Sequence, residues 1–553
     1  MNDQPGTTTG FSATRGDRTA GWLEQTRSEV LARNGMVATS QPLAAQAGLD
    51  ILKAGGNAFD AAVATSAVLN VVEPHSAGIG GDVFVIAWLA AERQLVALNG
   101  SGRSPALATP DELRRRGHTA SMPLYGIDSA VVPGAVDAWD VLLKRAGTMD
   151  LGEVLEGAVE LAERGFPVSE RIQNDWQLSA ALLKSDADSI RTYLPDGAAP
   201  PRYGLFRNPD LARAFRLLQV QGRDTFYQGE IAAAIVAKSR ALGGMLTHAD
   251  LGATQADWVE PLTARYRGLD IVEFPPNTQG FAALMMLNTL NAAQARFGVE
   301  LADLGTSSPL YWHLLVEAKK LAYTDLYRHN ADPEFADIPT ARLLSTSYAE
   351  ELASKIDLER AAQVRAEADP TGGTVYLTTA DRFGNMVSFI YSIYDSFGGG
   401  VTVPGFGFVL NNRAALFSMN PESPNHVAPR KRPFHTLLPG FVMQNGAPFL
   451  SFGLMGGTQQ AQGHVQVLLN MIDLHANLQS ASDAARFTHL QESNELQLES
   501  SLYARVGDAL AALGHRVIPA NGEKMGGYQA IARIDGVYRG ASDHRKDGQA
   551  VGY

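Results

Sequence analysis

The first strong hydrophobic pattern along the chain predicts a pair of helices separated by glycine. In residues 40–55, apolar side chains recur at helical spacing, Ser40 stands at an N-cap position and Gly55 ends the run. Asn57 then caps a second apolar run with the same spacing. We therefore expect two consecutive helices, with ordered structure beginning near Met36.

A glycine-rich loop follows this helical pair. Gly78, Gly80 and Gly81 precede an apolar run rich in Val, Ile and Phe, HSAGIGGDVFVIAWL. Nucleotide-binding loops run from strand through loop to helix, whereas this loop runs from helix to strand and no Lys-Ser/Thr pair follows it. This order favours a structural turn over a phosphate site.

The rest of the chain changes from helical to strand-rich patterns. Residues 150–250, 280–298 and 307–329 read mostly as helices. From Gly373 onward Val, Ile, Thr, Tyr and Phe dominate, which predicts a β-hairpin that turns at Asp381–Asn385, with strands and helices alternating after it. The succession predicts sheets with helices on separate faces, either α+β or layered α/β. No repeat or linker divides the chain.

Composition and charge exclude several classes of protein. The 553 residues carry a net charge of -12, which disfavours nucleic acid and anionic membranes as partners. No cysteine is present, so thiolate nucleophiles, disulfides and cysteine-ligated metals are excluded. The histidines closest to forming a pair, His435 and His464, fit structural roles better than metal ligation. Chemistry must come from hydroxyls, amines, carboxylates, histidine or a cofactor.

The N-terminal segment predicts a flexible lead-in over residues 1–33. It is polar and lacks the apolar run of a secretory signal peptide. The most apolar stretches of the chain are too short or too interrupted for the roughly 20 residues that span a bilayer. A cytoplasmic protein is expected.

One catalytic route remains that needs neither a metal nor a familiar motif. G-x-S-x-G, S-x-x-K and H-E-x-x-H are absent. A threonine that becomes N-terminal by internal cleavage can use its own α-amine, with a pKa of about 8, as the base. In residues 370–374 (PTGGT), two glycines let the backbone bend before Thr374, which opens a strand. A plain loop-to-strand junction is the alternative, and Thr378 and Thr379 lie in the same strand.

Many separate blocks give the chain a family resemblance from about Met36 to Gly548. It resembles the γ-glutamyltransferase (glutathione hydrolase) family of N-terminal-nucleophile hydrolases, and in subtype the oxamate amidohydrolases and cephalosporin acylases. The blocks include MVATSQPLAAQAGLDILKAGGNAFDAAVA, NVVEPHSAGIGGDVF, NGSGRSP, VPGAVDAW, FPPNTQG, DRFGN, GFVLNNRAALFS, APRKRPFHTLLP, GLMGGTQQ, DAARFTH and GASDHRKDG.

The resemblance implies a fold and a maturation. The fold is α+β, a four-layer αββα sandwich, and the chain is cut before the nucleophile. The large subunit would comprise residues 34–373 after the lead-in, and the small subunit residues 374–553, the two intertwined in one domain. Whether such pairs form a dimer stays open, and no metal or organic cofactor is implied.

The resemblance also implies roles for individual residues. Thr374 occupies the place of the nucleophile, and Ser392 that of a second hydroxyl that supports it. Gly456 and Gly457 fall where backbone amides form the oxyanion hole. Arg103 falls where the family grips the substrate carboxylate, a task that suits a guanidinium group.

Other pocket positions depart from the family pattern. Tyr394, Arg413 and Leu416 replace an Asn, a Gln and an acidic residue, and His435 and Thr436 replace a serine pair. Loss of the acidic residue removes the ion-pair partner of a substrate ammonium, at a cost of about 2–5 kcal/mol. We therefore expect a self-processing amide hydrolase or acyltransferase for γ-glutamyl or related small carboxylate-bearing amides, with oxamate or glutaryl amides without an amino group as alternatives. A non-catalytic binding protein on the same scaffold is the second hypothesis.

Overall fold

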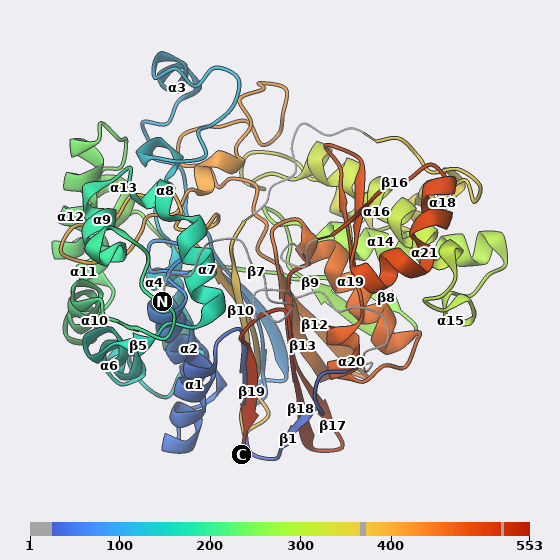
Figure 1. Cartoon of the computed structure of the whole chain (residues 1–553), viewed down its shortest axis with the longest axis horizontal. Coiled ribbons are helices and arrows are strands. Elements are labelled where there is room, and N and C mark those ends of the chain that lie inside the picture. The colour runs from blue at the N-terminus through green and yellow to red at the C-terminus, as the bar shows by residue number, and fades with distance from the viewer. Residues whose placement is uncertain (1–24, 365–371, 521–524) are drawn as a thin grey trace, which may run out of the picture.

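The computed structural model describes residues 25–364, 372–520 and 525–553, and two sheets form its centre (Figure 1). In spatial order, the first sheet consists of β1 (Val30–Ala32), β18 (Val537–Ser542), β17 (Gly527–Ile534), β13 (Ala447–Met455), β12 (Pro439–Gln444), β9 (Leu269–Glu273) and β8 (Leu262–Tyr266). The second consists of β19 (Gln549–Gly552), β2 (Met36–Thr39), β10 (Val375–Ala380), β11 (Met386–Ser392), β3 (Asp82–Leu89), β4 (Gln94–Gly100) and β7 (Asp257–Val259). All neighbouring strands within these two sheets run antiparallel.

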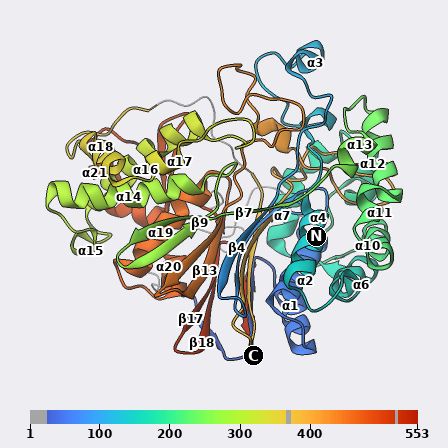
Figure 2. The ribbon, with the colours of Figure 1, turned by 180° about the vertical axis from the view of Figure 1, so that it is seen from behind.

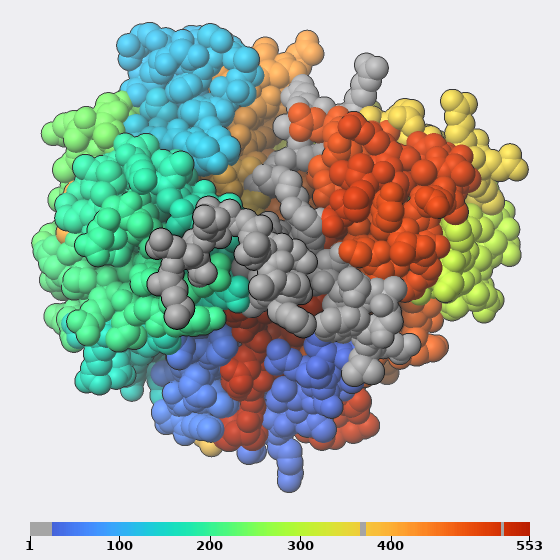
Figure 3. All heavy atoms as spheres, viewed as in Figure 1, coloured from blue at the N-terminus to red at the C-terminus, as the bar shows by residue number. Residues whose placement is uncertain are grey.

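Helices cover the outer face of each sheet, which gives four layers (Figures 1 and 2). The layer against the second sheet contains α1 (Pro42–Ala54), α2 (Ala58–Val72) and α4 (Ala135–Ala146). Outside it lie α5 (Leu151–Val154), α6 (Glu156–Arg164), α7 (Glu170–Leu178), α8 (Ala180–Leu183), α9 (Ala187–Tyr193), α10 (Pro209–Gln221), α11 (Asp224–Tyr227), α12 (Glu230–Ala241) and α13 (His248–Gly252). The layer against the first sheet contains α14 (Gly280–Phe297), α19 (Gln459–Ile472) and α20 (Leu478–Asp483). Around them lie α15 (Leu301–Leu304), α16 (Pro309–His329), α17 (Thr340–Leu343), α18 (Thr346–Ser354) and α21 (Ser500–Ala512). Figure 3 shows these two helical layers as a blue-green side and a yellow-to-red side.

Shorter elements complete the chain. They are α3 (Pro110–Arg115), the small sheet of β14 (Phe487–Leu490), β15 (Glu495–Leu498) and β16 (Arg516–Pro519), the pair β5 (Phe166–Pro167) and β6 (Leu205–Phe206), and the 3-10 turns η1 (Ile127–Ser129), η2 (Pro195–Gly197) and η3 (Arg413–Leu416). None of the described helices combines the length and the apolar character that crossing a bilayer requires. The predicted α+β sandwich of four layers is confirmed.

The first two helices show which local rules decide the boundaries. Asn57 caps α2 as predicted, in a capping box with Asp60, and all residues of α2 are buried. The prediction of Ser40 as the cap of α1 is wrong. Pro42 takes the first helical position, which moves the cap to Gln41, whose side-chain oxygen accepts from the amide of Leu43 at 2.6 Å.

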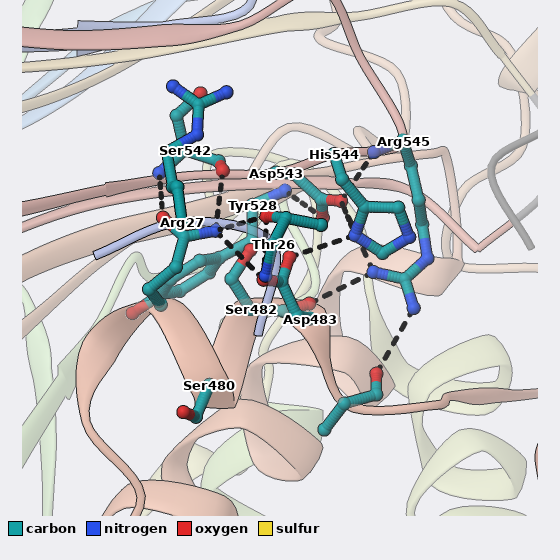
Figure 4. Close-up of polar contacts among 12 residues, drawn as sticks. Thr26, Arg27, Ser480, Ser482, Asp483, Tyr528, Ser542, Asp543, His544 and Arg545 are labelled. Atoms are coloured by element: carbon teal, nitrogen blue, oxygen red, sulfur yellow. Dashed lines mark hydrogen bonds and ion pairs between the residues drawn. The ribbon is translucent and has the colours of Figure 1, made fainter. Parts of the chain in front are cut away.

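Ordered structure begins before the predicted start near Met36. β1 occupies residues within the expected lead-in because Val30 pairs with Gly540 of β18. Ahead of β1, the amide and hydroxyl of Thr26 donate to Asp483 at 2.6 and 2.8 Å (Figure 4). Both partners lie more than 400 positions along the chain, so a local pattern could not reveal them. Residues 1–24 lie outside the described residues.

Candidate active site

Thr374 stands at the end of an inner strand of the second sheet. It directly precedes β10, which has β2 on one side and β11 on the other, and the predicted hairpin turn between β10 and β11 is confirmed. The Thr374 side chain is buried, and its Oγ1 donates to the carbonyl oxygen of Gly373 at 2.6 Å. A residue held by a central strand has a well-defined position, which a reacting group needs.

A second hydroxyl reaches the same carbonyl oxygen. Ser392 ends β11, opposite the start of β10, and its Oγ donates to the oxygen of Gly373 at 2.7 Å. The Ser392 Oγ also accepts from the amide of Tyr394 at 2.7 Å, where the backbone has a φ of 83° that non-glycine residues rarely adopt. Two donors therefore converge on the carbonyl of the peptide bond that joins Gly373 to Thr374, and donors in this position polarise a carbonyl.

The turn at Gly456 and Gly457 connects β13 to α19. The φ angles are 122° and 62°, and a Cβ added at Gly456 would lie only 3.2 Å from the Cα of Gly526. The carbonyl oxygens of this turn accept from the amide of Gln459 at 3.1 Å and from the side chain of Gln279 at 3.0 Å. These bonds hold the turn in one orientation, which only glycine fits without strain.

Thr374 and Gly456 line one cavity of about 370 Å³. Its charged and titratable lining residues, which sequence reasoning did not single out, are His75, Tyr125, Asp175, Asp395 and Lys546. Two of them lie in matched blocks, His75 in NVVEPHSAGIGGDVF and Lys546 in GASDHRKDG. The other three lie in none, so no signal in the sequence pointed to them.

Hydrogen bonds and ion pairs engage the two carboxylates of this cavity. The Nε2 of His75 lies 3.4 Å from Asp175. Burial raises the pKa of Asp175, but the hydrogen bond and charge of His75, with weaker help from Lys546, outweigh burial and lower that pKa to about 2. Tyr125 donates its hydroxyl to Asp395 at 3.0 Å, and burial together with the Asp395 charge raises the pKa of Tyr125 to about 12.

The replaced pocket residues form a buried cluster of their own. Arg413 is fully buried, with its Nε 3.4 Å from Asp82, its Nη1 3.4 Å from the Thr436 hydroxyl and its Cζ 4.8 Å from the centre of the Tyr394 ring. The Nε2 of His435 lies 3.3 Å from the same Asp82 carboxylate. Burial lowers the pKa of Arg413 to about 10.

This cluster borders the Thr374 site without lining its cavity. Asp82 pairs across the sheet with Ser392, and a Cβ at Gly372 would lie 3.0 Å from the Tyr394 ring. Leu416 is buried in the same hydrophobic core as Tyr394. The structure therefore brings the predicted substrate residues Tyr394, Arg413, His435 and Thr436 together, and none of them lines the Thr374 cavity.

Known proteins are similar to this chain in sequence and in fold over almost its full length. The profile of the γ-glutamyltranspeptidase family matches residues 44–553. The chain belongs to the γ-glutamyltranspeptidase family. The glutathione hydrolase-like YwrD proenzyme of Bacillus subtilis is 37% identical, over 95% of this chain and 99% of that protein. The oxamate amidohydrolase proenzyme of Klebsiella pneumoniae is 33% identical, over 95% and 100%. A crystal structure of cephalosporin acylase from Bacillus halodurans superimposes with a TM-score of 0.90, at 39% identity and covering 97% of this chain and 98% of that one.

This γ-glutamyltranspeptidase-family chain is therefore an enzyme with the N-terminal-nucleophile hydrolase fold, as its sequence predicted. The comparisons support the family and the subtype. The catalytic and substrate-binding roles of individual residues stay predictions.

Arg103 lies away from the Thr374 cavity. It lines a separate cavity of about 300 Å³ with Glu334 and Arg430. Its Nη1 lies 3.0 Å from Glu334 and 3.6 Å from Asp332, and the same nitrogen donates to the carbonyl of Arg430 at 3.1 Å. In this structure the guanidinium charge is matched by acidic neighbours, so its predicted contact with a substrate carboxylate would require those neighbours to release it.

The histidines also have protein partners. His464 hydrogen-bonds Glu273 at 2.9 Å and is not paired with His435. Within the described residues, His313, Glu317 and His515 are the one group close enough to hold a metal ion. The Lys320 ammonium lies 2.9 Å from Glu317 and already supplies the positive charge at this carboxylate. His313 and His515 hydrogen-bond each other at 2.8 Å.

Buried neutral histidines predict acid sensitivity of the fold. Burial, helped by nearby cations, lowers the pKa of His435 to about 3 and of His515 to about 2, and lowers the pKa of His489 well below its usual value. Each folded-state pKa lies below the unfolded value of about 6.5, so between these values the unfolded chain binds more protons. The free energy of unfolding should therefore fall with pH below 6.5, by about 2 kcal/mol per histidine at pH 5.

Urea denaturation at pH 7.5 and pH 5.0 measures this effect. Carboxylates with lowered pKa, such as Asp175, lose their contribution only as the pH falls below their unfolded value of about 3.9, outside this window. Burial raises the pKa of Glu73 and Glu273, so these two groups act in the opposite direction to the histidines. Equal free energies of unfolding at the two pH values would contradict the prediction.

Proposed function

We propose that the chain cuts itself between Gly373 and Thr374 and that the new N-terminal Thr374 is the nucleophile of an amide hydrolase or acyltransferase. The observation that carries the proposal is the convergence of two hydroxyls, from Thr374 and Ser392, on the Gly373 carbonyl oxygen at 2.6 and 2.7 Å. The relatives named above are described as proenzymes, which supports a maturation step.

The cut follows from the chemistry of these groups. The Thr374 oxygen attacks the Gly373 carbonyl carbon while the Ser392 hydroxyl stabilises the charge on the carbonyl oxygen. The C–N bond breaks, the threonine nitrogen gains a proton, and an ester joins the two residues. Water then hydrolyses the ester, which leaves a carboxylate on Gly373 and a free α-amine on Thr374.

The same threonine then serves the substrate. Its α-amine takes the hydroxyl proton as the oxygen attacks the amide carbonyl, and the amides at Gly456 and Gly457 hold the oxyanion. The amine product leaves, and water or an acceptor amine takes the acyl group from Thr374. The two fragments stay together because β10 inserts between β2 and β11, so one sheet contains strands of both.

For the substrate, we propose a small carboxylate-bearing amide. Relatives carry the names glutathione hydrolase-like, acylase and oxamate amidohydrolase. These names support amides as the class of substrate. Leu416, where an acidic residue would bind an ammonium, favours substrates without a free α-amino group. Rates with γ-glutamyl-p-nitroanilide, glutathione, oxamate and a glutaryl amide test this. Strong turnover of the first two alone would contradict the inference from Leu416.

The Ser392 hydroxyl should accelerate self-cleavage. In Ser392→Ala the carbonyl of Gly373 loses one of its two donors, so cleavage should slow by about 10²-fold or more. The fraction of cut chain on a denaturing gel, followed over time after purification, measures the rate. Ser392→Thr keeps the hydroxyl and should cut at a rate close to that of the wild type. Cleavage of Ser392→Ala at the wild-type rate would show that this hydrogen bond plays no part.

A further inference from the structure

The Thr374 cavity contains a cation that the family resemblance did not assign. Lys546 lies in the loop between β18 and β19 and lines the cavity together with Thr374 and Gly456. We propose that the Lys546 ammonium binds the carboxylate of the amide substrate beside Thr374. This inference rests on the function proposed above and names the residue that recognises the anionic group.

The charges around the cavity support this role. Asp175 has His75 at 3.4 Å, and Asp395 accepts from Tyr125 at 3.0 Å. Over the described parts of the chain, no hydrogen bond or ion pair of comparable length engages the Lys546 ammonium. An anionic group that enters the cavity therefore meets a cation that no direct ion pair within the described residues holds and whose charge also acts on the nearby carboxylates of Asp175 and Glu73.

Arg103, the alternative cation, is less suited in this structure. Its guanidinium lines another cavity and is held by Glu334 at 3.0 Å, with Asp332 at 3.6 Å. Recruiting it to Thr374 would break these pairs. Lys546 needs no such rearrangement.

The path of the Lys546 side chain is set by a glycine. A Cβ added at Gly527 would lie 2.6 Å from the Cγ of Lys546 and 3.2 Å from its Cε. The aliphatic stem therefore lies directly against the backbone of Gly527, next to Gly526 in the cavity wall. This packing covers the aliphatic stem of a residue that lines the cavity, which fits a side chain that keeps its ammonium end in the polar space.

A buried ion network fixes the loop that carries Lys546, and Figure 4 shows its members Asp543 and Arg545. The amide of Lys546 donates to the carbonyl of Asp543 at 3.2 Å, and Arg486 bonds the Asp543 carboxylate at 2.8 Å. Arg545 bonds Glu499 at 2.6 Å and Asp543 at 3.2 Å. Charge-assisted bonds in the protein interior hold the loop, so the ammonium is positioned before substrate arrives.

The cavity wall also contains apolar side chains. Leu178, Leu182 and Met455 supply apolar wall within the volume of about 370 Å³. Such a cavity suits a short apolar chain that ends in a carboxylate, such as the monoamide of a small dicarboxylic acid. The carboxylate can belong to the acyl part or to the amine part of the amide.

Three substrates of similar size show whether the recognised carboxylate lies on the acyl part or on the amine part of the amide. Glutaryl-p-nitroanilide carries the carboxylate on the acyl part, pentanoyl-4-aminobenzoate carries it on the amine part, and pentanoyl-p-nitroanilide has none. In Lys546→Met, kcat/KM should fall at least about 10-fold for the carboxylate-bearing substrate that the wild type prefers, mainly through KM. The neutral amide should change less than about 2-fold, and Lys546→Arg should recover most of the loss.

The controls separate this inference from the proposed function. Lys53→Met replaces an exposed lysine of α1 and should leave all three rates unchanged. Self-cleavage of Lys546→Met is followed on a denaturing gel, and Lys546→Gln is used if that variant is not cut. If Lys546→Met cuts itself normally but changes kcat/KM equally for charged and neutral amides, or for neither, the inference is overturned. The proposed function would still stand in that case. A wild type that neither cuts itself nor hydrolyses any of the three amides would overturn both.

Discussion

Replacing Thr374 with alanine should abolish self-cleavage and lower kcat/KM for amide hydrolysis by at least about 10⁴-fold. The hydroxyl that lies 2.6 Å from the Gly373 carbonyl oxygen is removed, and without the cut no α-amine forms at this position. A denaturing gel and mass spectrometry of the purified chain should show one unbroken species. Thermal unfolding should change little, because the substitution removes only a small side chain at the start of β10.

Two matched variants make this test specific. Thr374→Ser keeps a hydroxyl and should still be cut, so sequencing of the smaller fragment should detect serine as its first residue. Thr379→Val removes a buried hydroxyl from the same strand, where it donates to the carbonyl of Ala58 at 2.6 Å, and should be cut and active. An active, fully cut Thr374→Ala variant would falsify the proposed mechanism.

The second large effect is expected at Gly456. Alanine there would have to adopt a φ of 122° and would place its Cβ 3.2 Å from the Cα of Gly526, so the turn must shift. Misplacing one oxyanion-hole donor lowers kcat by about 10²–10³-fold. We expect this loss to appear in kcat more than in KM, because the oxyanion exists only after attack.

Gly446 offers a control with similar backbone geometry. It has a φ of 72° in the hairpin turn between β12 and β13, and a Cβ added there meets nothing within 4 Å. Gly446→Ala should therefore cost a little stability and leave kcat unchanged. Equal losses of kcat in Gly446→Ala and Gly456→Ala would show that strain alone, and not the position of the donor, explains the effect.

Local patterns predicted the features that depend on local chemistry. The cap at Asn57, the hairpin between β10 and β11 and the position of Thr374 directly before a strand all follow from residue types over a few positions. The long buried helix α14 likewise followed from its apolar composition. These elements carry their own start and stop signals, which tertiary contacts do not override.

Features set by distant partners could not be predicted in this way. The pairing of Val30 with Gly540 and the approach of Lys546 to Thr374 depend on how remote segments meet. The same holds for Arg103, whose place in a matched block gave no sign of Glu334, more than 200 positions further along the chain. Electrostatic roles in particular depend on neighbours that sequence spacing does not encode.

The position of β19 has a consequence for the timing of maturation. β19 pairs with β2, which in turn pairs with β10, so the sheet around Thr374 joins strands from both ends of the described chain. A ribosome makes residues 549–552 well after Thr374 itself has left the exit tunnel. The sheet around Thr374 is therefore complete only once translation has passed this strand, and we expect the proposed cut to follow that step. Nascent chains arrested before residue 549 should accumulate uncut.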